Sequence, residues 1–138
     1  MLKIIIALTA TLSVSGCLFD SPGQQCLNSF KQTLKDPNSG KVLEFNESKL
    51  TYSATNSYGA RLQGNALCAE ENGKWVRDLF NEEIAILNRM AEKLEASNNC
   101  RRAGGSREDC AGDSAALKYG NSDQNELKEE VRRELGFN

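Results

Sequence analysis

Residues 50–68 read LTYSATNSYGARLQGNALC, and this stretch decides the fold. In each half, apolar or small side chains take every second position, and hydroxyl, amide or charged ones take most positions between them. Such alternation with a period of two predicts β-strands that each have one buried face. The middle of the stretch, Asn56-Ser57-Tyr58-Gly59, consists of residues typical of turns. The sequence therefore predicts an antiparallel hairpin.

Further strands are predicted on both sides of this hairpin. Residues 42–45 suit a short strand, and Asn72-Gly73 is a strong signal for a two-residue turn that leads into Trp75-Val76. The region from about 41 to 77 is therefore expected to form a small antiparallel meander. So few strands are marginally stable alone and need a partner on one face. We expect Trp75 to pack between the sheet and a helix.

A short helix is predicted before the sheet. Ser21 suits the N-cap, Pro22 the first helical position, and Gln24 can complete a capping box. Its apolar side chains, spaced by three or four residues, are Leu27, Phe30 and Leu34. Asp36-Pro37 ends the helix, because the residue before a proline disfavours the helical conformation.

Two helices are predicted after the sheet. The longer one covers about residues 79–96, with Asp78 as its N-cap. Its apolar stripe consists of Phe80, Ile84, Leu87, Ala91 and Leu94, and Leu79, Ile86 and Met90 widen it. That width favours packing on the sheet over a narrow coiled-coil seam. The last helix begins at Ser122-Asp123 and ends at Gly136. It would bury Leu127, Val131 and Leu135.

Together these elements predict an α+β fold. The meander of residues 41–77 would pack on the helix of residues 79–96, between N- and C-terminal helices. A polar loop is expected at about residues 97–121, within a single small domain of residues 23–138. A domain of this size usually benefits from covalent crosslinks.

The overall charge gives no indication of a charged partner. The 138 residues include 17 Lys and Arg and 19 Asp and Glu, for a net charge of −2. No long block of one sign is present, so we expect no binding to nucleic acid.

The N-terminus has the features of an export signal. Lys3 precedes a run of mostly apolar residues from 4 to 14. As a helix this run would rise roughly 16 Å, about half of the hydrocarbon thickness of a bilayer. A secretory signal peptide over residues 1–16 therefore fits better than a spanning helix.

The end of this leader, Val14-Ser15-Gly16-Cys17, resembles the lipobox of bacterial lipoproteins. The resemblance implies that the leader is cut before Cys17, which then carries a covalent lipid and holds the protein on a bilayer. Residues 17–22 would form a lipidated tether. In Gram-negative members, a residue other than Asp after the lipidated cysteine, here Leu18, implies transfer to the outer membrane, facing the periplasm. The alternative is ordinary cleavage, which leaves Cys17 as a plain residue of a periplasmic protein.

The other four cysteines, Cys26, Cys68, Cys100 and Cys110, form an even set. We expect structural disulfides in an oxidising compartment, and four cysteines allow three pairings. A Cys100–Cys110 bond would close a local loop, and a Cys26–Cys68 bond could join the first helix to a strand. The chain has no histidine and no Cys-x-x-Cys pair, which disfavours a metal site or a redox pair. No cofactor is expected beyond the lipid on Cys17.

A second resemblance covers residues 27–70. Leu34-Lys35-Asp36-Pro37-Asn38-Ser39 and Asn56-Ser57-Tyr58-Gly59 are similar to a small bacterial and phage domain of unknown function. The chain departs from that pattern in having Gly40 and Ala60, where members usually have Ala and Gly. This resemblance implies no catalytic residues.

Two groups of residues could form a contact surface. Arg101, Arg102 and Arg107 could bind an anionic group, although such a run is more often a solvated loop. Tyr58 could present a recognition edge on the hairpin, although an ordinary cross-strand role is the favoured interpretation.

Catalytic chemistry has little support in the sequence. Without histidine there is no Ser–His or Cys–His nucleophile. Glu70-Glu71 and Glu82-Glu83 are candidate acids, but neighbouring helical side chains point about 100° apart, and a solvated helix start explains the second pair. We therefore expect a non-enzymatic accessory factor that binds another envelope component. The alternatives are a carboxylate-dependent cell-wall hydrolase and a purely structural spacer.

Overall fold

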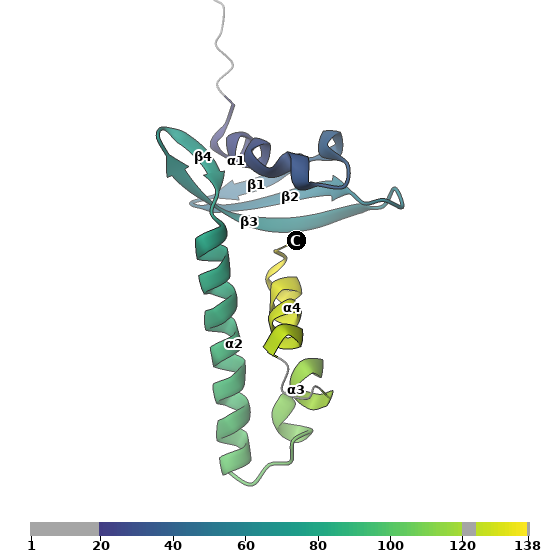
Figure 1. Ribbon diagram of the computed structural model, residues 1–138, viewed down its shortest axis with the longest axis vertical. Helices are drawn as coiled ribbons and strands as arrows, with labels where there is room; N and C mark the ends of the chain where they lie inside the picture. The colour runs from purple at the N-terminus through teal and green to yellow at the C-terminus, as the bar shows by residue number, and fades with distance from the viewer. Residues whose placement is uncertain (1–19, 120–123, 138) are drawn as a thin grey trace, which may run out of the picture.

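The computed structural model describes residues 20–119 and 124–137. The predicted leader, Cys17 and the predicted cap at Ser122-Asp123 lie outside these residues. The strands are β1 (Lys41–Asn46), β2 (Lys49–Thr55), β3 (Arg61–Glu71) and β4 (Lys74–Arg77). The helices are α1 (Pro22–Phe30), α2 (Leu79–Arg102), α3 (Ala115–Tyr119) and α4 (Gln124–Leu135). Short 3-10 helices are η1 (Lys31–Thr33), η2 (Pro37–Ser39) and η3 (Asp109–Ala111). Figure 1 shows a body, made of α1 and the four strands, and an arm, made of α2, η3, α3 and α4.

The four strands follow one another in the sheet in chain order, each antiparallel to its neighbours. In the central pair, Leu50 lies opposite Ala66 and Tyr52 opposite Gly64. The turn predicted at Asn72-Gly73 is confirmed, because the φ angles of its two residues are 52° and 75°, as a type I′ turn requires. The meander predicted for residues 41–77 is confirmed.

Helix α1 covers the apolar face of this sheet. It begins at the predicted N-cap, with the Ser21 hydroxyl accepting a hydrogen bond from the Gln24 N–H at 3.3 Å. The Gln24 side chain donates to Asn28 at 3.1 Å instead of completing a capping box. The core between helix and sheet consists of Cys26, Leu27, Phe30, Leu50, Tyr52, Ala66 and Cys68. A Cβ atom at Gly64 would lie 2.8 Å from the Tyr52 hydroxyl oxygen, so this position requires glycine. The predicted alternation of apolar and polar faces is confirmed.

Trp75 packs at the border of this core. Its ring packs edge to face on the Phe45 ring, with the ring centroids 5.1 Å apart. The backbone N–H of Trp75 donates a hydrogen bond to the side-chain oxygen of Gln25 in α1 at 3.1 Å. The predicted packing between sheet and helix is therefore present, and the helix is α1.

Helix α2 meets the sheet at its N-terminal turns and then runs away from it (Figure 1). The Asp78 N–H donates to the Leu67 carbonyl at 2.7 Å, and the Leu67 N–H donates to the Glu82 carboxylate at 3.0 Å. The sequence predicted that this helix lies along the sheet. Instead, α1 occupies the apolar face, and much of the opposite face is polar, so most of α2 packs elsewhere.

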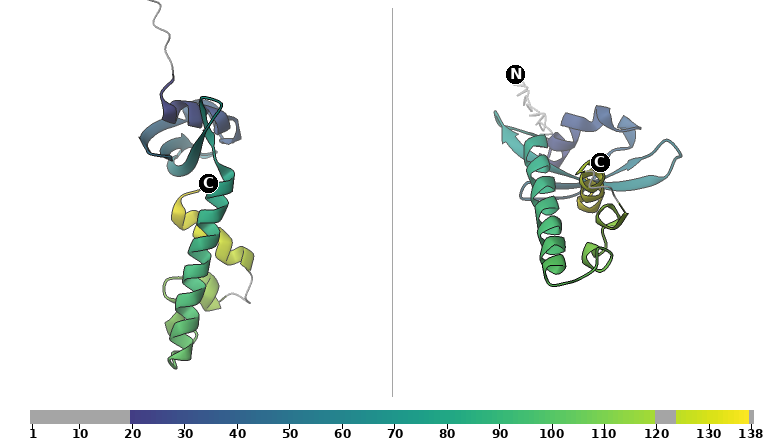
Figure 2. Two further views of the ribbon diagram at one scale, coloured as in Figure 1. Left: turned by 90° about the vertical axis from the view of Figure 1, so that its left-hand side faces the viewer. Right: turned by 60° about the horizontal axis from the view of Figure 1, so that its bottom comes forward.

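The inner side of α2 packs on α4. The shared core consists of Ile86, Met90, Leu127, Val131 and Phe137. The C-terminal end returns to the sheet, where the Asn65 N–H donates to the Gly136 carbonyl at 2.7 Å and its side-chain amide donates to the Leu135 carbonyl at 2.9 Å. Both views in Figure 2 show α4 beside α2 and the C-terminal end close to the sheet. The arm is therefore attached to the body at both of its ends.

Helix α2 continues to Arg102 instead of ending near residue 96, so the predicted polar loop of residues 97–121 is partly helical. Ser97 in this added part of α2 is buried, and a disulfide joins Cys100 near the end of the helix to Cys110 in η3. A Cβ atom at Gly105 would lie 2.7 Å from the Cys100 sulfur, so the turn passes closely over the disulfide. The disulfide thereby fixes the last turns of α2, which contain Asn98 and Asn99, to η3.

Of the three possible cysteine pairings, the structure contains Cys26–Cys68 and Cys100–Cys110. The first joins α1 to β3 across the body, and the second closes the loop at the far end of the arm. The prediction of a disulfide-crosslinked α+β fold is confirmed. In residues 20–119 and 124–137, no helix is both long and apolar enough to cross a membrane.

Candidate protein-binding surface

A row of apolar side chains on α2 is exposed to solvent. Phe80 is 74% exposed, Leu87 50%, and Ile84 and Leu94 38% each, and Ala91 between them is also exposed. We call these five residues the α2 stripe. They are the apolar residues that the sequence placed against the sheet. Contiguous exposed apolar surface of this kind marks interaction sites on soluble proteins.

The stripe is exposed because a different side of α2 faces the protein. The buried residues of α2 are Glu82, Ile86, Met90 and Ser97. At about 100° per residue, their mean direction lies roughly 110° around the helix axis from that of the stripe. Helix α2 thus has two adjacent apolar sides, of which one packs on α4 and the other has no cover among the described residues.

A groove of about 580 Å³ adjoins the stripe under the β3–β4 hairpin. Trp75 and Glu70 line it from the hairpin, and Ile84 and Asn88 line it from α2. Because Ile84 belongs to both features, stripe and groove form one continuous surface.

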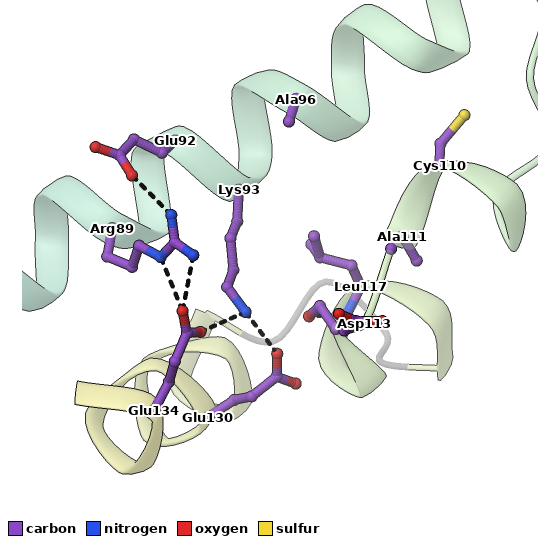
Figure 3. A pocket seen from close by; sticks show the side chains of 12 residues that line it. Arg89, Glu92, Lys93, Ala96, Cys110, Ala111, Asp113, Leu117, Glu130 and Glu134 are labelled. Carbon is purple, nitrogen blue, oxygen red and sulfur yellow. Dashed lines mark hydrogen bonds and ion pairs between the residues drawn. The ribbon is translucent and has the colours of Figure 1, made fainter. Parts of the chain in front are cut away.

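A second cleft, of about 750 Å³, lies between α2 and the helices that follow it. Figure 3 shows that Lys93 reaches from α2 toward two glutamates of α4, and its ammonium lies 2.7 Å from Glu134 and 3.3 Å from Glu130. Arg89 also bonds Glu134, at 2.8 Å, and Glu92 at 3.0 Å. Each of the two cations bonds a carboxylate of α4, so the network holds α4 against α2.

The pKa values in this cleft follow from the pairing. Hydrogen bonds from Lys93 and then Arg89 lower the pKa of Glu134. Burial raises the pKa of Glu130, but hydrogen bonds from the Ala116 N–H, the Ser114 hydroxyl and Lys93 outweigh it, so this pKa is lowered too. Both carboxylates are therefore held in the charged form, which suits ion pairing and opposes a role as a proton donor near neutral pH.

The candidate acids of the sequence do not converge on a site. Glu82 is 2% exposed and forms an ion pair with Arg77 at 2.8 Å, so the predicted solvated helix start is wrong for this residue. Glu83 points instead to α4, where it pairs with Lys128 and Arg132. In the part of the chain that the structure describes, no group of carboxylates or cysteines could hold a metal ion.

The predicted contact residues belong to two parts of the molecule, with the arginines at the end of the arm and Tyr58 on the body. Arg101 and Arg102 are exposed at the C-terminal end of α2, where basic side chains interact favourably with the helix dipole. Arg107 donates from its Nε to the Leu117 carbonyl at 3.2 Å. Tyr58 is 93% exposed in the β2–β3 turn, so the favoured cross-strand interpretation is wrong for it. Tyr58 and the three arginines therefore do not share one surface.

Sequence reasoning found the stripe residues but assigned them to the core. The available signal was their spacing, which alternates between four and three residues from Phe80 to Leu94. That spacing is the narrow seam of a coiled coil, and the broadening residues Ile86 and Met90 belong to the other apolar side.

Comparisons with known proteins give no relative for this chain. No protein-family model matches it, and no curated protein or solved structure matches it either.

Proposed function

We propose that this chain is an exported bacterial lipoprotein, anchored through Cys17, that acts without catalysis by binding an envelope protein through the α2 stripe. The observation that carries the binding role is the exposure of the stripe on a helix that is otherwise well held. An apolar row of this length is costly to leave in water, at roughly 25 cal/mol per Å².

The disulfides support export and the anchor. Disulfides persist in oxidising compartments such as the periplasm. Since Cys26 pairs with Cys68 and Cys100 with Cys110, Cys17 is the one cysteine of five that remains. Lipidation of Cys17, as the lipobox resemblance implies, accounts for the odd cysteine.

The anchor would orient the molecule. Asp20 is three residues after Cys17, so it lies at most about 10 Å from the lipidated residue. The body would therefore sit at the bilayer surface, since α1 begins at Pro22. Helix α2, with 24 residues, spans about 36 Å and carries the stripe away from the body. Leu18 after the anchor points to the outer membrane as the site.

The anchor is tested by the intact mass of the protein extracted from bacterial membranes, before and after reduction and thiol alkylation. We expect the mass of residues 17–138 plus acyl groups, with four alkylated thiols that appear only on reduction. In membrane fractions, a Leu18→Asp variant should move from the outer to the inner membrane. An unacylated mass would contradict the proposal.

The binding role is tested by a photo-crosslinking amino acid placed at Leu87 in living cells, with the same group at the exposed Glu92 on another side of α2 as the control. Specific protein adducts from Leu87 and none from Glu92 are expected. Equal yields from both positions would contradict a binding role for the stripe.

A further inference from the structure

The α2 stripe follows a heptad pattern that specifies a partner helix. With the heptad set by its spacing, Phe80, Leu87 and Leu94 take the d positions, and Ile84, Ala91 and Asn98 take the a positions. A β-branched residue at a with leucine at d favours two parallel strands, and a single asparagine at an a position fixes register and favours the dimer. The pattern therefore matches the seam of a parallel, two-stranded coiled coil.

From this seam we propose that the stripe is covered by α2 of a second copy of this chain, parallel and in register. This inference rests on the proposed function, because it assigns the partner of the same surface and uses the anchor to set the direction. Each seam residue then contacts its own equivalent in the second copy, as in other two-fold symmetric interfaces.

The positions that flank the seam are compatible with such a pair. In a parallel pair, each g position lies next to the e position five residues later in the other copy. By position these pairs are Glu83 with Asn88, Met90 with Glu95 and Ser97 with Arg102, and none of them brings like charges together. The g residues already face α4, since Met90 and Ser97 are buried in the arm and Glu83 pairs with Lys128 and Arg132. The pairing therefore rests on the a and d residues of the seam.

The membrane anchor selects the parallel arrangement. Two copies anchored in one leaflet have their bodies at the same surface, with both helices leading away from it. An antiparallel pair would place the second body at the far end of α2, about 36 Å away. The three residues between Cys17 and Asp20 are too few to span the distance from the membrane to a body in that position.

Helix α2 is already formed and held in place within the single chain. The Asp78 carboxylate accepts a hydrogen bond from the Asn81 N–H at 3.0 Å, α4 packs along one side, and the Cys100–Cys110 disulfide holds the far end. Helix nucleation is therefore not a cost of binding. The seam is short, so confinement to a membrane, which raises the effective concentration, supplies the remaining affinity.

Disulfide trapping of the full chain in bacterial membranes tests this arrangement. Single cysteines are introduced as Ile84→Cys, Leu87→Cys and Leu94→Cys, with Glu92→Cys as the control away from the seam. After mild oxidation, the intact mass and a non-reducing gel report covalent dimers. A parallel pair links all three seam variants to themselves and leaves the control and the unmodified chain monomeric.

Each other result overturns the proposal. Dimers from Leu87→Cys alone would indicate an antiparallel pair centred on that residue, and equal dimers from Glu92→Cys would indicate random collision. Adducts to a different protein at the seam, or none at all, would exclude a second copy while leaving the lipid anchor and a partner for the arm intact. Conversely, a dimer of the unmodified chain through Cys17 would contradict the anchor.

A charged substitution in the seam gives a second test of the same pairing. Adding Leu87→Glu to Ile84→Cys places two carboxylates in the seam, and the penalty of burying them should lower the dimer yield by about tenfold. Leu87 is half exposed, so the monomer should still fold, as its two native disulfides would show by mass. An unchanged yield would overturn the pairing.

Discussion

The body and the arm are stabilised in different ways. The body has a continuous core with Phe30 and Tyr52 packed edge to face, and a disulfide between residues 42 positions apart in the chain. The arm has a smaller core, several ion pairs between α2 and α4, and a disulfide that spans 10 positions. The body covers its main apolar face with α1, whereas the arm leaves the α2 stripe in solvent. The exposed apolar surface therefore lies on the arm, whereas the larger core and the long-range disulfide lie in the body.

The largest expected effect separates the two disulfides. Removing the long-range bond with Cys26→Ala and Cys68→Ala should lower the free energy of unfolding by about 4 kcal/mol, from the entropy of closing a loop of that length. Removing the short-range bond with Cys100→Ala and Cys110→Ala should cost about 3 kcal/mol. Urea unfolding of both double variants measures the difference. Equal or reversed losses would contradict the comparison of body and arm.

A second substitution breaks the junction between the two regions. Glu82 accepts hydrogen bonds from Arg77 and from the Leu67 N–H, and the Arg77 guanidinium also lies 4.9 Å from the Phe30 ring centroid. Glu82→Ala removes the carboxylate that a mostly buried arginine and the Leu67 N–H both donate to, and should cost at least about 3 kcal/mol. The neighbouring Glu83→Ala removes a partly exposed pair and should cost less than about 1 kcal/mol. Similar losses in urea unfolding would indicate that Glu82 does not join the regions.

A third test compares the stability cost of truncating a leucine in the core between α2 and α4 with that of truncating one on the exposed α2 stripe. Leu127 is 3% exposed in the arm core, and Leu127→Ala should cost about 2–3 kcal/mol in the monomer. Leu87→Ala on the stripe should change the monomer's stability by less than about 0.5 kcal/mol. Thermal unfolding of the two variants measures the contrast. A large loss at Leu87 would show that the stripe is covered within the chain.

The body was predictable from local patterns. The alternation from Leu50 to Cys68, the Asn72-Gly73 turn and the Ser21 cap each act over a few residues, so the sequence shows them directly. The pairing of Cys26 with Cys68 was one of three possibilities, and the core around Leu50 selects it by bringing α1 onto β3.

The arm was harder to predict because its arrangement depends on competition between distant segments. The stripe and the inner side of α2 are both apolar, and only the position of α4 decides which side is buried. That position depends on Asn65, whose side chain binds the end of α4 from the middle of β3. Neither the buried Glu82–Arg77 pair nor this asparagine has a distinctive local pattern.

The smallest expected effect concerns the ion pairs of the arm and their pH dependence. The lowered pKa values of Glu130 and Glu134 mean that these carboxylates stabilise the folded arm fully above the ordinary glutamate pKa of about 4.3. That contribution is lost as the pH falls through the lowered values.

The ammonium of Lys93 gives the matching upper limit. Burial lowers its pKa, but hydrogen bonds from Lys93 to Glu134 and Glu130 raise it more, so its contribution is lost only at strongly alkaline pH. Lys93→Met should therefore cost under about 1 kcal/mol at neutral pH. The difference from the unmodified chain in urea unfolding should shrink toward zero as the pH falls through the lowered pKa values of Glu130 and Glu134. A difference that does not change as the pH falls would contradict stabilisation by these ion pairs, because that contribution titrates with the two glutamates.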